Sequence, residues 1–597
     1  MENAPKFFCA DKSVNCRAMA VAALSALVSA LIYGYNYGAD PNLAQILPFI
    51  HKLQNPALYP GDPYIQSLAS FPSLYPYMVA ALVKPAWLPL FHACGYALAS
   101  AAFFWLAYRL ALLLFKDEKT AAVSCLLMAL SPLITVLSIL GDDPILKTSF
   151  YQTMLAAPVS LGAIYLFLSG RPSWALGLAG GLYWINALPA NYLAALLFAA
   201  SLAAADKKKL LPGWALFAVL FGGWVFWRHG LPNAFGPASP EYERVLRAWY
   251  LGHAYPFSWT AEKWGRAATY LVLFGFFIRE GVGRTAFTRQ IAAFLWALLG
   301  MWLIGLAAAE FVHLPLLQTA QLFRSDTLFL AVGIFFAADY IVELLKSGEA
   351  EGACLVGLLV ISLTELGAPY VAPFAVLLLL ARKFYPRWAE AVAAGSALAC
   401  VFYSFITPLL ALKTGAAAAL FAWLFLVRAG KAPRADAAKW ALALALLQFL
   451  PAAYERMHVG LEYLPQRERQ WRAVQRWAAE NTPESAVFFT PMPQQGFRVF
   501  SLRSSVCEWL DGAGMYWAPG FEKTWLARQH DLYYLTGASG HGEKELQPHE
   551  RAARFAALAR KYGADFVVDE GQEPLPFSLL YSTGSFSVYR ISPVQGL

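Results

Sequence analysis

The chain has 597 residues, of which 59% are hydrophobic and only 14% are charged. Soluble proteins carry roughly a quarter charged residues, so this chain has too few polar side chains to cover a water-soluble body of its size. Its formal charge of +8 does not indicate nucleic-acid binding, because the basic residues cluster in short loops between apolar runs. We therefore expect an integral membrane protein and exclude nucleic acid as a partner.

Apolar runs recur along the first part of the chain and predict a polytopic α-helical protein with about fifteen transmembrane helices. Several runs are shorter than the roughly 20 residues that a straight crossing needs. The two runs on either side of Pro189 predict short helices joined by a break. The runs lie near residues 18–37, 90–115, 120–140, 150–169, 173–188, 189–205, 211–227, 266–278, 290–309, 327–345, 352–367, 369–381, 388–409, 415–427 and 437–452.

The distribution of basic residues predicts the topology. With the N-terminus in the cytoplasm, alternation of the spans places the basic loops, such as residues 207–209 and 382–383, on the cytoplasmic side. The long connections 38–73, 228–262 and 310–326 then lie outside. Function is expected at this outer face, because long connections on a rigid helical body carry most binding sites.

The sequence changes character near residue 453, which divides a transmembrane domain (1–452) from an extracytoplasmic domain (453–597). Residues 465–481 predict a helix with Trp471, Val474 and Trp477 on one face, and residues 548–562 predict another. Residues 486–489, 565–568 and 585–591 predict strands. This alternation is typical of a small α/β domain. The tail contains no GxGxxG, Walker or GxSxG motif.

Two acidic residues in the first outer loop are candidates for chemistry. Asp40 directly follows the first span, where partial desolvation can raise a carboxyl pKa toward that of a general base. Alternatively, Asp40 only caps a helix that starts at Pro41. Asp62 stands in a Gly-Asp-Pro sequence, which favours a structural turn over substrate binding.

A second acidic pair, Asp142 and Asp143, occupies a tight outer turn. These carboxylates could bind a divalent cation or orient a sugar or phosphate. The favoured alternative is a solvated turn in which an Asp caps a helix that follows at Pro144. Two carboxylates alone do not specify a metal site, so we expect no metal and no cofactor unless a cation binds here.

The third outer connection carries His313, Gln321 and Arg324. An arginine entering an apolar span is costly unless it has a partner, and a guanidinium binds phosphate bidentately. Arg324 is therefore a candidate for binding a lipid phosphate, with Gln321 beside it. The alternatives are that Arg324 reaches the lipid headgroups or pairs with Asp326.

Polar and aromatic side chains flank the expected break near Pro189, including Trp184 and Asn186. Polar groups at a helix break inside a membrane usually line a cavity, and aromatic rings suit a sugar face, although helix packing could also explain them. His51 and His313 belong to a set of scattered outer histidines that could form a metal site only by convergence in three dimensions. The seven cysteines include no CxxC motif.

Together these features resemble the GT-C superfamily of multi-spanning glycosyltransferases. The likeness rests on Asp40 directly after the first span, the long first outer loop, the acidic turn at Asp142 and Asp143, the broken span from Trp184 to Asn191, and the outer domain. Residues 317–325 and 477–483, with the arginines at 498 and 503, resemble an uncharacterised bacterial branch of that superfamily.

The resemblance implies a bacterial inner-membrane enzyme that transfers a sugar with inversion from a polyprenyl-phosphate donor. The acceptor would be a glycan, a lipid or a protein. The residue matching Asp40 would deprotonate the acceptor hydroxyl, and an arginine such as Arg324 would stabilise the departing phosphate. The other candidates (Asp62, Asp142, Asp143, His51, Gln321, Trp184, Asn186 and His313) would help to bind the substrates.

Two other classes of function stay open. A transporter or flippase for a lipid-linked or polysaccharide precursor usually shows inverted repeats and charges at the midplane of the membrane; the sequence shows no convincing repeat. If the chain is a non-catalytic membrane scaffold, we expect Asp40 and Arg324 to be far apart and not to be needed for its function. The glycosyltransferase reading predicts that both residues face one outer cavity.

Overall fold

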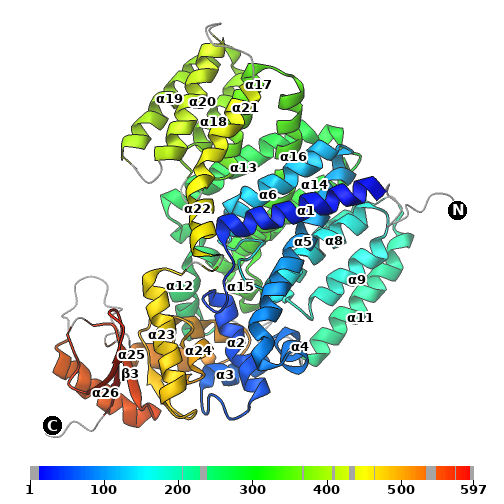
Figure 1. The fold of residues 1–597 in the computed structure, drawn as a ribbon. Coiled ribbons are helices and arrows are strands. Elements are labelled where there is room, and N and C mark those ends of the chain that lie inside the picture. Colours follow the sequence, from blue (N-terminus) through cyan, green and yellow to red (C-terminus); the bar gives the residue numbers. More distant parts are fainter. Residues whose placement is uncertain are drawn as a thin grey trace.

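The computed structural model describes residues 12–204, 206–228, 238–365, 369–406, 411–428, 437–460, 462, 464–532, 535, 546–571 and 573–591. Most of them form helices that pack into one body. The C-terminal strands and their helices, yellow to red in Figure 1, form a lobe at one end of that body. The predicted class, a helical membrane protein with a small α/β domain, is confirmed.

Helices occupy the predicted apolar runs. Within the described ranges, seven helical segments are long and apolar enough to cross a membrane, and α8, α10 and α17 are apolar but shorter. The helices of the body are α1 (Lys12–Tyr33), α5 (Leu88–Phe115), α6 (Glu118–Leu130), α8 (Gln152–Leu168), α9 (Pro172–Leu182), α10 (Ala187–Leu202), α11 (Leu211–Trp227), α13 (Ala261–Gly281), α14 (Thr288–Ala307), α16 (Asp326–Lys346), α17 (Ala350–Leu363), α18 (Ala372–Phe384), α19 (Ala389–Ile406), α20 (Ala411–Arg428) and α21 (Ala437–Leu446).

Helix α16 lies at the centre of this body. Of the apolar window in the segment Pro315–Lys346, 78% is buried, against 17% for the segment Lys208–Trp227. A helix that is apolar on all sides belongs inside a helical bundle, and α16 packs against α6 and α13. The short helix α17 is buried along nearly its whole length. Neighbouring helices rather than lipid therefore surround this helix, which is too short to cross the membrane by itself.

The predicted helix break is present, but not at Pro189. Helix α9 ends at Leu182 and α10 begins at Ala187, so the break covers residues 183–186 and Pro189 falls in the first turn of α10. Asn186 caps α10, with its Oδ1 accepting the Leu188 N–H at 3.2 Å. Proline is favoured in a first turn, where its missing N–H breaks no helical hydrogen bond.

The connections gather at two opposite ends of the body. At one end, which we call the basic end, ion pairs join neighbouring connections: Lys346 to Asp117 at 3.3 Å, Lys383 to Glu280 at 3.0 Å and Arg382 to Glu351 at 3.1 Å. The other end, which we call the domain end, carries the C-terminal domain. It also carries α2 (Pro41–Gln54), α3 (Pro63–Ser67), α4 (Tyr75–Leu82), α7 (Pro132–Thr135), α12 (Pro240–Ala254) and α15 (Pro315–Thr319).

The C-terminal domain is built on a five-stranded sheet of order β2-β1-β3-β5-β4. Strand β1 runs parallel to β2 and β3, and β5 runs antiparallel to β3 and β4. The strands are β1 (Val487–Phe489), β2 (Ser504–Ser505), β3 (Phe566–Asp569), β4 (Ser578–Ser582) and β5 (Ser587–Arg590), and the helices are α23 (Gln466–Asn481), α24 (Phe497–Ser501), α25 (Phe521–Leu532) and α26 (Pro548–Tyr562).

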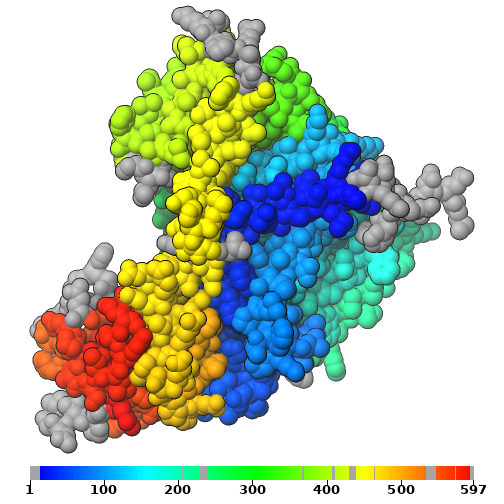
Figure 2. Space-filling view, in the orientation of Figure 1, coloured from blue at the N-terminus to red at the C-terminus, as the bar shows by residue number. Residues whose placement is uncertain are grey.

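Helix α22 (Leu450–Val459) leads from the body to this domain and contains the predicted boundary at residue 453. Trp471 and Val474 of α23 are buried and Trp477 packs beside them, as the predicted helix face requires. The yellow α23 lies beside the blue segment that follows α1 (Figure 2), where Arg472 donates to the Tyr37 carbonyl oxygen at 2.9 Å.

Candidate functional site

A cavity of ≈ 520 Å³ lies at the domain end, between the helical body and the C-terminal domain. Segments far apart in the chain line it: the start of α2, the residues before α4, the start of α8, the break between α9 and α10, the end of α11, and α12. The connection from α15 to η7 (Leu322–Ser325) and the end of η11 (Trp509–Tyr516) complete the lining. Its volume suits a ligand larger than a single ion or small anion.

Arg324 is one of two charged side chains among the described residues that line this cavity. Its side chain is 16% exposed, its guanidinium lies 3.7 Å from Asp143 and 5.7 Å from the centre of the Tyr250 ring, and its buried Nε has no hydrogen-bond partner within the described ranges. A buried N–H without a partner is costly. The geometry therefore leaves Arg324 able to donate to an anion in the cavity.

Lys147 and Arg324 keep the Asp143 carboxyl ionised. Burial acts to raise the pKa of the Asp143 carboxyl, but the charges of Lys147 and Arg324 outweigh it and hold that pKa below its usual value. Lys147 makes a close ion pair with Asp143. Asp143, Arg324 and Asn186 also line a smaller cavity of ≈ 60 Å³ next to the main one.

The turn that carries Asp143 is fixed against η7 and α16. The Asp326 carboxylate accepts the N–H groups of Leu140 at 2.6 Å and Gly141 at 3.2 Å. A Cβ at Gly141 would lie 2.5 Å from the Arg324 Cα, so only glycine allows this approach. His253 lies 2.8 Å from the Gly141 carbonyl oxygen through its Nδ1. Burial, and then the Arg324 charge, lower the pKa of His253 to about 4, so this ring is neutral near pH 7.

Asp142 points away from Asp143 and has its own partners. It pairs closely with Lys263, and with Arg266 at 2.8 Å. Asp142 and Asp143 each neutralise cationic side chains of the protein, and the described residues contain no group of three or more His, Cys, Asp or Glu that could hold a metal ion.

Amide side chains form a polar wall of the cavity. Asn186 donates through Nδ2 to Thr153 at 2.8 Å, and Asn191 accepts from the Tyr183 hydroxyl at 2.8 Å. The buried Oε1 atoms of Gln152 and Gln321 have no hydrogen-bond partner within the described ranges. Amides that alternate with tyrosine and tryptophan rings are suited to the hydroxyl groups and faces of a sugar.

Asp40 is the N-cap of α2, whose first turns enter the cavity through Asn42, Gln45 and Ile46. Its Oδ1 accepts the N–H groups of Asn42 at 2.9 Å and Leu43 at 3.1 Å. The structural interpretation of Asp40 is therefore correct as far as Oδ1 is concerned. Asp40 does not itself line the cavity, so the prediction that Asp40 and Arg324 both face it is met by Arg324 alone. The Asp40 charge still acts on the buried Tyr151, together with those of Asp143 and Arg324.

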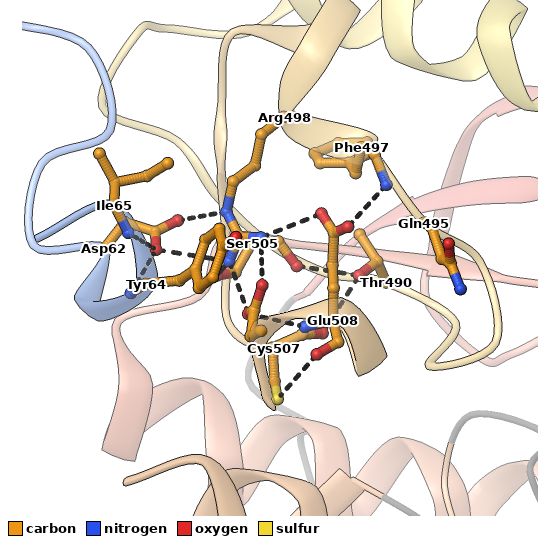
Figure 3. Close-up of polar contacts among 12 residues, drawn as sticks. Asp62, Tyr64, Ile65, Thr490, Gln495, Phe497, Arg498, Ser505, Cys507 and Glu508 are labelled. Atoms are coloured by element: carbon orange, nitrogen blue, oxygen red, sulfur yellow. Dashed lines mark hydrogen bonds and ion pairs between the residues drawn. The ribbon is translucent and has the colours of Figure 1, made fainter. Parts of the chain in front are cut away.

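The C-terminal domain contributes a wall through Ala513, Met515, Tyr516 and Trp517. The Tyr516 hydroxyl is buried without a hydrogen-bond partner in the described part of the chain. The domain is held to the first loop by what we call the Arg498 cluster: Asp62, Arg498, Glu508 and Asp511. Figure 3 shows the Arg498 guanidinium between Asp62 of the loop and Glu508 of the domain.

The Arg498 cluster is fully buried, with three carboxyl groups facing one guanidinium. Arg498 donates to Asp62 at 2.7 Å and to Asp511 at 2.8 and 2.9 Å, and lies 3.2 Å from Glu508. Burial raises the pKa of the Glu508 carboxyl to about 7, although the Arg498 charge acts to lower it. Because Glu508 precedes η11 and Asp511 lies within it, the cluster fixes the cavity wall that η11 provides.

The structure brings Arg324, Gln321 and Asn186 together in the cavity and places Asp143 3.7 Å from the Arg324 guanidinium. Seven predicted residues do not line it: Asp40, Asp142 and Asp143, whose partners are given above, and four others. Asp62 belongs to the Arg498 cluster. His51 is half-buried in α2, where desolvation and then His92 lower its pKa to about 4. The Trp184 indole donates to the Leu220 carbonyl oxygen at 2.9 Å, and His313 lies 3.5 Å from Glu243.

Sequence reasoning missed several residues of the cavity, above all Arg228, Tyr250 and Tyr516. Arg228 follows a long apolar run, so the argument that identified Arg324 could have found it. Tyr250 and Tyr516 have no such local signal.

Comparisons with known proteins add little about activity. Residues 469–529 match a family model described only as a domain of unknown function, DUF6798; the matched segment includes Arg498 and η11. The chain matches none of the curated proteins. Among solved structures it is similar to the "Crystal Structure of ArnT from Cupriavidus metallidurans in the apo state", at 13% sequence identity over 97% of each chain and a TM-score of 0.42.

Proposed function

We propose that this protein is an inverting glycosyltransferase of the GT-C type that uses a polyprenyl-phosphate-linked sugar. The observation that carries the proposal is the partly unsatisfied Arg324 guanidinium in a cavity lined by amides and aromatic rings. A guanidinium is suited to binding a phosphate group, and the amides and aromatic rings are suited to binding a sugar. The likeness of the sequence to the GT-C superfamily supplies the reaction type.

In this proposal the cavity faces the periplasm or the cell exterior of a multi-pass inner-membrane protein. The basic connections at the opposite end support this orientation, because basic loops stay in the cytoplasm. The domain end then meets the outer leaflet, from which a lipid-linked donor can present its phosphate to Arg324.

The proposed reaction is one displacement. The acceptor hydroxyl attacks the anomeric carbon of the sugar, the bond from that carbon to the phosphate oxygen breaks, and the polyprenyl phosphate leaves with the electron pair. Asp40 takes the hydroxyl proton through Oδ2, which accepts no hydrogen bond within the described ranges. Arg324 stabilises the negative charge on the departing phosphate. Gln321 and Asn186 orient the sugar.

The test compares wild-type protein with Asp40→Asn in a panel of polyprenyl-phosphate sugars, with sugar release as the readout. Asparagine keeps the helix cap but cannot accept the proton. We expect the wild type to consume one donor and Asp40→Asn to bind that donor without consuming it. If both proteins behave alike across the whole panel, Asp40 serves only as a cap, and a transporter or scaffold accounts better for the fold.

A further inference from the structure

The second charged side chain in the cavity lining is Arg228, at the end of α11. It donates closely through Nη1 to the Ser70 carbonyl oxygen. An arginine that ends a span often extends to the lipid headgroups. Arg228 instead is half-buried, lines the cavity, and contacts the chain directly before the cavity residue Phe71.

The positive charges of the two arginines are compensated differently. Arg324 has Asp143 behind it at 3.7 Å. Arg228 forms no ion pair with a carboxylate in the described part of the chain, and Tyr77 is the one ionisable group found to act on its charge. No described residue that lines the cavity is acidic. A half-buried guanidinium without a carboxylate partner is electrostatically unfavourable unless an anion binds.

The cavity is large enough for Arg228 and Arg324 to bind separate anionic groups. A cavity of ≈ 520 Å³ holds a ligand much larger than one phosphate group. Arg228 adjoins the segment before α4, whereas Arg324 adjoins Tyr250 of α12 and the turn of Asp143. The two guanidinium groups therefore belong to different walls of one cavity.

We propose that Arg228 binds a second anionic group of the reacting molecules, a phosphate or a comparable oxyanion, while Arg324 binds the phosphate that is bonded to the sugar. This inference rests on the proposed function and specifies its substrates. The second anion belongs either to the donor, as the second phosphate of a diphosphate-linked sugar, or to the molecule that accepts the sugar. In both cases a guanidinium with free N–H groups is the matching receptor.

Binding measurements on the purified full-length protein test this inference with three probes: farnesyl phosphate, farnesyl diphosphate and inorganic phosphate. The variants are Arg228→Gln, Arg228→Lys and Arg324→Gln, with Arg289→Gln as the control, because Arg289 is exposed at the start of α14. We expect Arg324→Gln to weaken farnesyl phosphate binding by about tenfold or more. A melting temperature equal to that of Arg289→Gln shows that Arg228→Gln is folded.

If the second anion belongs to the donor, we expect wild type to bind farnesyl diphosphate about tenfold more tightly than farnesyl phosphate. Arg228→Gln should remove this difference. If the second anion belongs to the acceptor, we expect inorganic phosphate to bind to wild type that is saturated with farnesyl phosphate. It should not bind to Arg228→Gln under the same conditions. In either case Arg228→Lys, which keeps the charge, retains part of the binding.

The inference is overturned if Arg228→Gln changes neither the preference for diphosphate nor the binding of inorganic phosphate. The proposed function fails separately if wild type binds no farnesyl phosphate, or binds it equally well without Arg324.

Discussion

At the residue scale, the Asp40 carboxylate has two oxygens with different surroundings. Oδ1 caps α2 by accepting two backbone N–H groups, and the proposed chemistry uses Oδ2. The same side chain can therefore hold the helix that lines the cavity and take a proton. Substitutions that keep or remove the cap separate the two roles.

Asp40→Ala is expected to lower the free energy of unfolding by about 1 kcal/mol, because the N-cap is lost. Asp40→Asn should leave it nearly unchanged, since asparagine caps a helix as well as aspartate does. Thermal unfolding in one detergent measures both. Equal destabilisation by the two variants would show that the charge at Asp40, rather than its hydrogen bonds, holds α2 in place.

Glu508 makes stability depend on pH. Burial raises the folded-state pKa to about 7, above the value of about 4.3 in an unfolded chain. The folded protein therefore binds the proton more tightly, and the stability gained from it is present below about pH 4 and is lost as the pH rises toward 7.

Glu508→Gln is expected to flatten the dependence of unfolding on pH between 5 and 7, so that its stability relative to wild type is higher at pH 8 than at pH 5. Melting curves across this range are the measurement, with the exposed Glu480→Gln as the control. If the melting temperatures of wild type and Glu508→Gln change in parallel with pH, the raised pKa of Glu508 is contradicted.

At the element scale, the membrane helices could be predicted because each corresponds to a continuous apolar run in the sequence. The residues at which the helices begin and end could not be predicted in this way. The break between α9 and α10 depends on Asn186 acting as a cap, a signal weaker than Pro189 nearby. Strands β2 and β4 were missed because β2 has two residues and β4 is largely exposed, so neither carries the apolar pattern of a strand.

The close packing of the turn at Gly141 against η7 gives a prediction at this scale. Gly141→Ala should displace Arg324, because the new Cβ would meet the Arg324 backbone at 2.5 Å, and should weaken farnesyl phosphate binding about tenfold or more.

The matched control is Gly222→Ala in α11, where a Cβ would meet nothing within 4 Å. It should leave binding unchanged. If Gly141→Ala binds farnesyl phosphate like wild type, the position of Arg324 does not depend on this turn.

At the scale of the whole molecule, the cavity could not have been predicted, because it forms where distant segments meet. Asp62 and Arg498 are 436 positions apart, yet lie 2.7 Å from each other. Local sequence could identify Arg324, Gln321 and Asn186 as polar residues in apolar surroundings. It contained no sign that Tyr516 of the C-terminal domain would join them.

The two ends of the molecule should lie on opposite sides of the membrane. In a variant without its native cysteines, Glu480→Cys in α23 should react with a membrane-impermeant maleimide in intact spheroplasts. Arg289→Cys at the basic end should react only after the membrane is permeabilised. Both positions are exposed. The reverse pattern would place the cavity in the cytoplasm.

The most direct measurement of the central claim is an experimental structure of the protein with a bound polyprenyl-phosphate sugar. We predict that the phosphate lies within hydrogen-bond distance of the Arg324 guanidinium and the sugar against Asn186 and Gln321, with its anomeric carbon toward α2. A phosphate bound outside this cavity, with Arg324 still paired only to Asp143, would contradict it.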